Sequence, residues 1–170
     1  MTDLNVYIRS VGAMSDEIQR FVREQRLGFV ATVNADGSPN VSPKGTTTVW
    51  DDDHLVFADI RSPGTVANIR RDPRVEINVV DPMVRKGYRF RGTAEVLEDG
   101  PRFEEVVARY EASGVQAWDE GGRRIRAVVL VGVEEVRPLV SPGYDSGIGD
   151  DEMLERWVAY WRSLGRDTGR

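Results

Sequence analysis

The 170-residue chain has no cysteine and only one histidine, and these shortages exclude much of the side-chain chemistry that enzymes use. Without cysteine there is no disulfide framework, no zinc–thiolate or iron–sulfur site and no thiol nucleophile. With His54 as the single histidine, a multi-histidine metal site is excluded and a histidine-based triad is disfavoured. We therefore expect no metal site and assign no catalytic side chain, so that any catalysis relies on a bound cofactor.

Long apolar runs and an excess of positive charge are also missing. No stretch approaches the roughly 20 apolar residues of a membrane-spanning helix, and the charged N-terminus lacks the pattern of a secretory signal. The net charge of −5 disfavours a dedicated nucleic-acid binder. These absences predict a cytoplasmic protein that binds neither membranes nor nucleic acids.

The residues that are present suit one packed domain. Hydrophobic residues make up 40% of the chain, which is too many for a disordered protein. No internal repeat or low-complexity linker divides the sequence. We expect one domain over residues 1–170, with a core of about 15–137 and a C-terminal loop and helix over 138–170.

Turn residues and apolar periodicity divide the chain into short strands and a few helices. Helices are predicted from an N-cap at Ser15 to near Gly28, from an N-cap at Ser62 to Arg71, and over 101–112 and 150–164. Strands are predicted over 28–33, 40–50, 54–59, 74–80, 88–97 and 125–133, followed by a loop over 138–149. Adjacent hairpins favour antiparallel pairing, so the pattern predicts a mainly β fold: a small barrel of six or seven mostly antiparallel strands with peripheral helices.

Two segments carry candidate anion- and ligand-binding residues. The helix start at Ser62 offers free backbone N–H groups, the Arg61 guanidinium and the Thr65 hydroxyl, which together suit a phosphate, although a capped surface helix is the alternative. The segment 42–48 contains Lys44, one of only two lysines among 23 basic residues. Its proline cannot donate to a sheet and its glycine admits a close ligand, whereas a blunted edge strand explains the same residues without a ligand.

A third segment, 85–92, combines several arginines with two aromatic residues. Strand alternation places Lys86, Tyr88 and Phe90 on one face. Base stacking on such a face is one interpretation, and a solvated strand is the other.

In their order along the chain, these segments resemble the pyridoxamine 5′-phosphate oxidase-like family of FMN-binding split barrels. The resemblance rests on the hairpin 36–39, on the stretch 56–75 with its ending 68–75, and on 92–95 after the basic strand, and it covers about residues 15–136. The C-terminal tail looks like that of an uncharacterised flavin-nucleotide-binding subgroup. The resemblance implies a split β-barrel of FMN-binding type and a homodimer with two FMN sites at the subunit interface.

The resemblance also implies site residues, carried over by position. The isoalloxazine ring and the ribityl chain would be lined by Ser42, Pro43, Lys44, Gly45, Thr46 and Thr47. The phosphate would be approached by Asp59, Ile60, Arg61, Ser62 and Thr65. Lys86 and Gly87 would contact the flavin from the neighbouring strand. The family often has a phosphate-binding lysine where this chain has Thr65, so the anion would rely on Arg61, Lys44 or Lys86 with the helix N-terminus. Ser42 stands where the vitamin B6 oxidase itself has a phosphate-binding arginine.

The implied function is that of an FMN-dependent oxidoreductase acting on an unknown small molecule. Two alternatives stay open within the same fold: a relative that uses the deazaflavin F420, and a non-catalytic protein that binds or senses a flavin. A nucleic-acid-binding barrel that uses the arginine-rich strand is a further alternative, and it would show salt-dependent retention of RNA or DNA.

Overall fold

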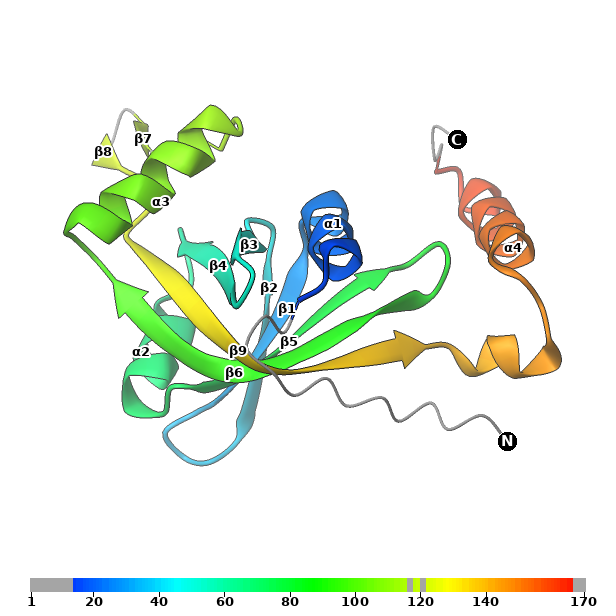
Figure 1. Ribbon diagram of the computed structural model, residues 1–170, viewed down its shortest axis with the longest axis horizontal. Helices are drawn as coiled ribbons and strands as arrows, with labels where there is room; N and C mark the ends of the chain where they lie inside the picture. The colour runs from blue at the N-terminus through cyan, green and yellow to red at the C-terminus, as the bar shows by residue number, and fades with distance from the viewer. Residues whose placement is uncertain (1–13, 116–117, 120–121, 167–170) are drawn as a thin grey trace.

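The computed structural model describes residues 14–115, 118–119 and 122–166, and its main feature is one curved antiparallel sheet (Figure 1). Seven strands follow the order β2-β1-β5-β6-β9-β4-β3. They are β1 (Gly28–Val33), β2 (Pro39–Lys44), β3 (Thr48–Asp51), β4 (His54–Asp59), β5 (Arg74–Asp81), β6 (Lys86–Leu97) and β9 (Ala127–Val140). The helices are α1 (Asp16–Gln25), α2 (Pro63–Arg71), α3 (Pro101–Ala112) and α4 (Asp150–Ser163), with a 3₁₀ helix η1 (Pro142–Ser146). The predicted split β-barrel is confirmed.

The core consists of two apolar layers, one on each side of β4. Five consecutive residues of β4, from Leu55 to Asp59, are buried. Because neighbouring side chains of a strand point to opposite faces, both faces of such a strand must be covered. Phe57 packs into the cluster that includes Val22 of α1, whereas Val56 packs with Val106 of α3. Thus α1 and α3 cover opposite faces of the same strand.

The two longest strands, β6 and β9, pair along their whole length and bend together (Figure 1). Their register shifts at Arg91 and Gly92, which pair with Glu135 and Val133, so that Glu134 is the extra residue of a β-bulge. A Cβ atom on Gly92 would lie 2.0 Å from the carbonyl oxygen of Gly132. The close pairing of these strands at the bulge therefore requires glycine at position 92.

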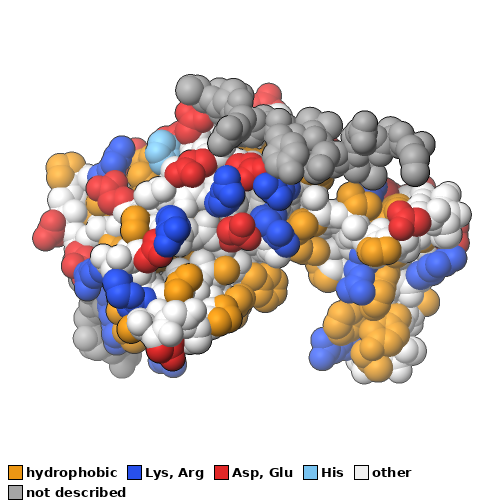
Figure 2. Space-filling model, turned by 90° about the horizontal axis from the view of Figure 1, so that it is seen from below, with side chains coloured by type: hydrophobic (Ala, Val, Ile, Leu, Met, Phe, Trp, Pro, Cys, Tyr) orange, Lys and Arg blue, Asp and Glu red, His pale blue; other side chains and the backbone are white. Residues whose placement is uncertain are grey.

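The C-terminal segment forms an arm, defined here as η1 and α4, that projects from the end of β9 (Figure 1). A notch separates the arm from the barrel, and hydrophobic side chains gather on the arm (Figure 2). The guanidinium of Arg85 stacks 3.8 Å from the ring centroid of Trp157, and Tyr144 Oη donates to the carbonyl of Val84 at 2.6 Å. The buried residues of α4, Met153 and Val158, belong to neither core cluster. The arm is thus attached to the β5–β6 turn and shares no core with the barrel.

Two predicted boundaries are wrong. The single strand predicted over 40–50 is divided into β2 and β3, because the chain turns after Lys44 and Thr47 donates from both N–H and Oγ1 to the Lys44 carbonyl, at 3.3 and 2.9 Å. The strand predicted over 125–133 continues to Val140, so the predicted loop over 138–149 begins within β9 and includes η1. The pairing of β9 with β4 ends at Gly132, so beyond it one side of β9 has no neighbour among the described strands. Pro138 lies in this part of β9 and is tolerated there, because a proline has no N–H to donate and none is needed on that side. The short ladder of β7 (Trp118–Asp119) and β8 (Gly122–Arg123) was not predicted.

Candidate functional site

A buried lysine lies where two of the predicted segments meet. Lys44, at the end of β2, is 4% exposed. Its Nζ donates to Ser62 Oγ at 2.8 Å, to Thr65 Oγ1 at 3.5 Å and to Ser42 Oγ. No carboxylate forms an ion pair with it within the described residues; burial lowers its pKa, and the charge of Asp59 opposes that shift. A buried cation with hydroxyl partners suits an anionic ligand, because an anion would compensate the cost of burying the charge.

The N-terminus of α2 beside Lys44 is not capped by a side chain. Ser62 stands at the N-cap position, yet its hydroxyl accepts a hydrogen bond from Lys44 and none from the first turn of α2. The prediction that Ser62 caps the helix is therefore wrong, whereas Ser15 does cap α1 by accepting from the Ile18 N–H at 3.4 Å. The first-turn N–H groups of α2 remain available, and the helix dipole makes this end partially positive.

The turn into α2 is fixed by Asp59, whose Oδ1 accepts a hydrogen bond from the Ser62 N–H at 2.7 Å. Ile60 packs against the core layer beneath α3. Arg61 is exposed and forms no hydrogen bond or ion pair with any described residue. The guanidinium of Arg61 therefore remains available to a ligand at the rim.

The chain between β2 and β3 is held by hydroxyl groups. Thr46 Oγ1 accepts a hydrogen bond from the Ala58 N–H at 2.9 Å, and the Thr46 carbonyl accepts one from Tyr110 Oη at 2.9 Å. Pro43 and Gly45 are exposed, and nothing lies within 4 Å of a Cβ built on Gly45. The threonines hold this segment in place, so that exposed backbone at Gly45 is open to a flat ligand.

Lys86 and Gly87 lie in a different part of the folded structure. In the sheet, β1 and β5 separate β6 from β2, which carries Lys44. Lys86 Nζ pairs with Asp150 Oδ1 of the arm at 2.5 Å, and this ammonium holds the pKa of the Asp150 carboxyl below its usual value. Lys86 and Gly87 both line a pocket of about 320 Å³ beside α1. The structure thus brings Ser42, Lys44, Asp59, Ser62 and Thr65 together within one chain and leaves Lys86 and Gly87 apart from them.

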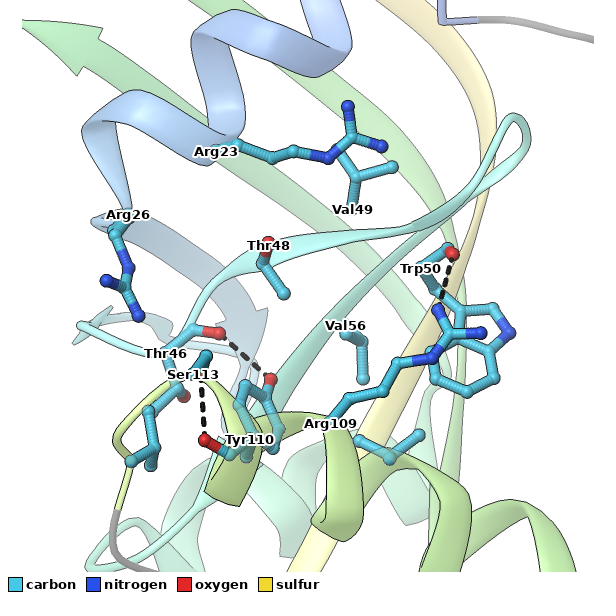
Figure 3. Close-up of a pocket in the computed structure, with 12 residues that line it drawn as sticks. Arg23, Arg26, Thr46, Thr48, Val49, Trp50, Val56, Arg109, Tyr110 and Ser113 are labelled. Carbon is cyan, nitrogen blue, oxygen red and sulfur yellow. Dashed lines mark hydrogen bonds between the residues drawn. The ribbon is translucent and has the colours of Figure 1, made fainter.

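A second pocket, of about 270 Å³, opens between α1, β3 and α3 (Figure 3). Its lining consists of Arg23, Arg26, Thr46, Thr48, Val49, Trp50, Val56, Val106, Arg109, Tyr110, Ser113 and Val115. Of these, only Thr46 was among the predicted site residues. The sequence offered no signal for the others, because α1 and α3 are far apart in the chain. We call it the arginine pocket below.

The outer face of β1 and β2 is apolar and exposed. Phe29 and Val33 are each 42% exposed, and Val41 is 62% exposed. Phe29 pairs with Pro43 and Ala31 with Val41, so these side chains lie next to one another on one face of the sheet. A contiguous apolar patch on a sheet face is typical of an interaction surface.

Two further observations concern metals and membranes. Within the part of the chain that the structure describes, no three histidine, aspartate or glutamate side chains are grouped to hold a metal ion. No helix of that part combines the length and apolar character needed to span a bilayer.

Known proteins similar to this chain share its fold. Residues 14–139 match the family of pyridoxamine 5′-phosphate oxidase. Among solved structures, HupZ of Group A Streptococcus is 30% identical over 75% of this chain and 95% of its own, with a TM-score of 0.65. An FMN-binding protein from Syntrophomonas wolfei is 13% identical over 74% of this chain and 86% of its own, with a TM-score of 0.61. An F420 reductase is 21% identical over 74% of this chain and 98% of its own, with a TM-score of 0.55. No curated protein matches the chain.

Proposed function

Because the chain belongs to the pyridoxamine 5′-phosphate oxidase family, we propose that it binds a flavin or deazaflavin cofactor and serves as an oxidoreductase for a small molecule. FMN is the first candidate and F420 the alternative, since the similar structures include an FMN-binding protein and an F420 reductase. When bound, such a cofactor supplies hydride or electron transfer. The protein's residues then need only hold it, orient it and exclude water.

The observation that carries this proposal is the group of Lys44, Ser62 and Thr65 at the uncapped N-terminus of α2. A phosphate monoester carries about two negative charges near neutral pH. Here it would meet one ammonium, the hydroxyls around that ammonium and free helix N–H groups, with Arg61 at the rim. Lys44 reaches Thr65 Oγ1, so we propose that this lysine from β2 replaces the lysine that the family often has at position 65.

The flavin ring is proposed to lie along residues 42–47. Gly45 has open space where a side chain would stand, which lets a planar group approach the backbone. Thr46 and Thr47 are already hydrogen-bonded within the chain, so their part is to hold the strand break that presents Gly45.

We propose that two copies of the chain assemble into a homodimer, with the apolar face of β1 and β2 as part of the interface. Exposure of Phe29 and Val41 supports this surface. The separation of Lys86 and Gly87 from Lys44 supports it as well, because residues that lie apart in one chain can meet across a dimer. In this arrangement Lys86 and Gly87 of one protomer would contact the flavin held by its partner.

The first test is cofactor binding by the purified full-length protein. We expect FMN or F420 to bind at one molecule per chain, with a dimeric mass in light scattering. Absorbance and mass of the bound ligand distinguish the two cofactors, and turnover with a reduced nicotinamide donor distinguishes an enzyme from a flavin store. Failure of both cofactors to bind at micromolar concentration would overturn the proposal.

A second prediction concerns pH. Burial lowers the pKa of Lys44, so the unliganded protein loses this charge at a lower pH than an ordinary lysine does, while a bound phosphate favours the charged form. FMN affinity should therefore fall by about tenfold per pH unit once the pH exceeds the lowered pKa of the free protein, until it reaches the pKa of the complex.

The matched control for this pH effect is Lys44→Arg. Arginine keeps its proton throughout the pH range in which lysine loses it, so the alkaline loss of affinity should disappear in this variant. Affinity of the unchanged protein that stays constant up to a pH of about 10 would contradict the role of Lys44.

A further inference from the structure

The arginine pocket combines three guanidinium groups with an apolar floor. Arg23 and Arg26 extend from α1 on one side, and Arg109 reaches toward Trp50 from α3 on the other (Figure 3). No aspartate or glutamate is part of its lining. Its floor contains the buried side chains of Val49, Val56 and Val106, at 7%, 2% and 1% exposure. A pocket of this composition favours a ligand with a negative charge at one end and an apolar body at the other.

The three arginines differ in how far other contacts hold them. Arg109 stacks on Trp50 at 3.8 Å, donates to the Trp50 carbonyl at 3.1 Å and pairs with Glu105 at 3.0 Å. Arg23 donates to Gln19 at 2.9 Å. The backbone N–H of Arg26 donates to the Val22 carbonyl at 3.1 Å, but its side chain forms no hydrogen bond or ion pair with any described residue, so the guanidinium is available to a ligand.

The backbone at Arg26 gives an independent observation. Arg26 ends α1 in the left-handed region, with φ of 54°. Glycine is the residue that most often occupies this helix-ending position, because a side chain is strained there. Arg26 thus keeps a guanidinium at the pocket in a conformation that favours glycine, and strained residues are enriched at binding sites.

From these observations we propose that the arginine pocket binds a small aromatic carboxylate, with its carboxylate at Arg26 and its ring over the valine floor. The volume of about 270 Å³ lies below the range of roughly 300–1,000 Å³ for pockets that hold drug-sized ligands, so the ligand is small. Arginine forks pair with a planar carboxylate through two parallel hydrogen bonds. Arg23 adds charge from the same helix, and Arg109 adds it from α3.

The pocket adjoins the segment proposed to hold the flavin ring, because Thr46 belongs to both. We infer from this adjacency that the bound carboxylate is the substrate, and only that step rests on the proposed function. The binding site itself stands on the structure alone, and its occupation requires no flavin.

The test measures benzoate binding to the flavin-free protein by calorimetry, with the neutral benzamide and inorganic phosphate as probes. We expect benzoate to bind at least about tenfold more tightly than either, because benzamide lacks the charge and phosphate lacks the apolar body. Equal binding of benzoate and benzamide, or of benzoate and phosphate, would overturn the proposal.

The decisive variant is Arg26→Gly, which removes the guanidinium and provides the residue that the backbone favours. Thermal stability should stay equal or increase, while benzoate affinity falls about tenfold or more. Arg20→Gln is the matched control, since Arg20 is exposed on the same helix and does not line the pocket; its benzoate affinity should be unchanged. Unchanged benzoate affinity in Arg26→Gly would overturn the site.

FMN binding by the same variants separates this inference from the proposed function. If FMN fails to bind but benzoate binds in an Arg26-dependent manner, the pocket stands and the cofactor proposal fails. If FMN binds and benzoate does not, the cofactor proposal stands and the pocket is refuted.

Discussion

Replacing Lys44 with methionine is expected to weaken FMN binding by about 1.5–3 kcal/mol, or roughly one to two orders of magnitude in Kd. Methionine keeps most of the volume of lysine but offers the phosphate no charge. The loss should be large because Lys44 is 4% exposed, and water screens a buried charge far less than an exposed one. Fluorescence quenching during FMN titration measures the change directly.

The matched variant is Arg61→Gln, which removes an exposed cation from the same phosphate region. Its effect should be smaller, at about 1 kcal/mol or less, because solvent screens its charge. The thermal transition of each unliganded variant shows whether it folds. Equal FMN affinity of the Lys44→Met variant and the unchanged protein would remove Lys44 from the site.

The largest expected effect on stability comes from Gly92→Ala. The added Cβ would lie 2.0 Å from the carbonyl oxygen of Gly132 and 2.9 Å from its carbonyl carbon, so backbone would meet backbone at the bulge. Overpacking of a core costs about 1–3 kcal/mol, and a backbone neighbour relaxes less readily than a side chain. We expect a loss of about 3 kcal/mol or more, a large part of the stability of an ordinary domain.

Urea unfolding monitored by circular dichroism measures this loss. Gly132→Ala is the control on the opposite strand, because its Cβ would have no neighbour closer than 3.7 Å. It should change stability by no more than about 1 kcal/mol. Comparable unfolding midpoints for the two variants would show that the bulge between β6 and β9 adapts to a side chain at position 92.

Much of the fold was predictable where local signals determine the structure. The boundaries of β1 and β4 agree with the predicted 28–33 and 54–59, because turn residues flank both segments. Helix α3 agrees with 101–112, since Pro101 begins it and an apolar stripe continues through Tyr110. These elements depend on neighbours in the chain rather than on distant contacts.

Where distant contacts decide, the predictions failed. The break after Lys44 is closed locally by Thr47, but a hydrogen bond from the Ala58 N–H to Thr46, twelve positions apart, holds it against β4, and sequence periodicity does not encode that contact. The extension of β9 to Val140 follows from its pairing with Lys86 of β6. Similarly, the Ser62 hydroxyl accepts from Lys44 instead of capping α2, a choice made by the neighbouring strand.

The candidate site was predictable only in part. Both segments that carry Lys44 and Ser62 were identified from the sequence, and the structure places them within hydrogen-bonding distance. The arginine pocket was not identified, because Arg26 and Arg109 come from helices that only the folded chain brings together. Whether Lys86 meets the same ligand depends on a second copy of the chain and remains a prediction.

The arm has a consequence for how the protein unfolds. Its buried residues Met153 and Val158 share no cluster with the barrel, and an ion pair from Lys86 and the stack of Arg85 on Trp157 help to hold it. Segments attached by few contacts open as independent cooperative units, at a lower free energy than the whole molecule. Detachment of α4 would therefore change tryptophan emission while the β-sheet stays intact, so fluorescence and circular dichroism are expected to give two different melting temperatures.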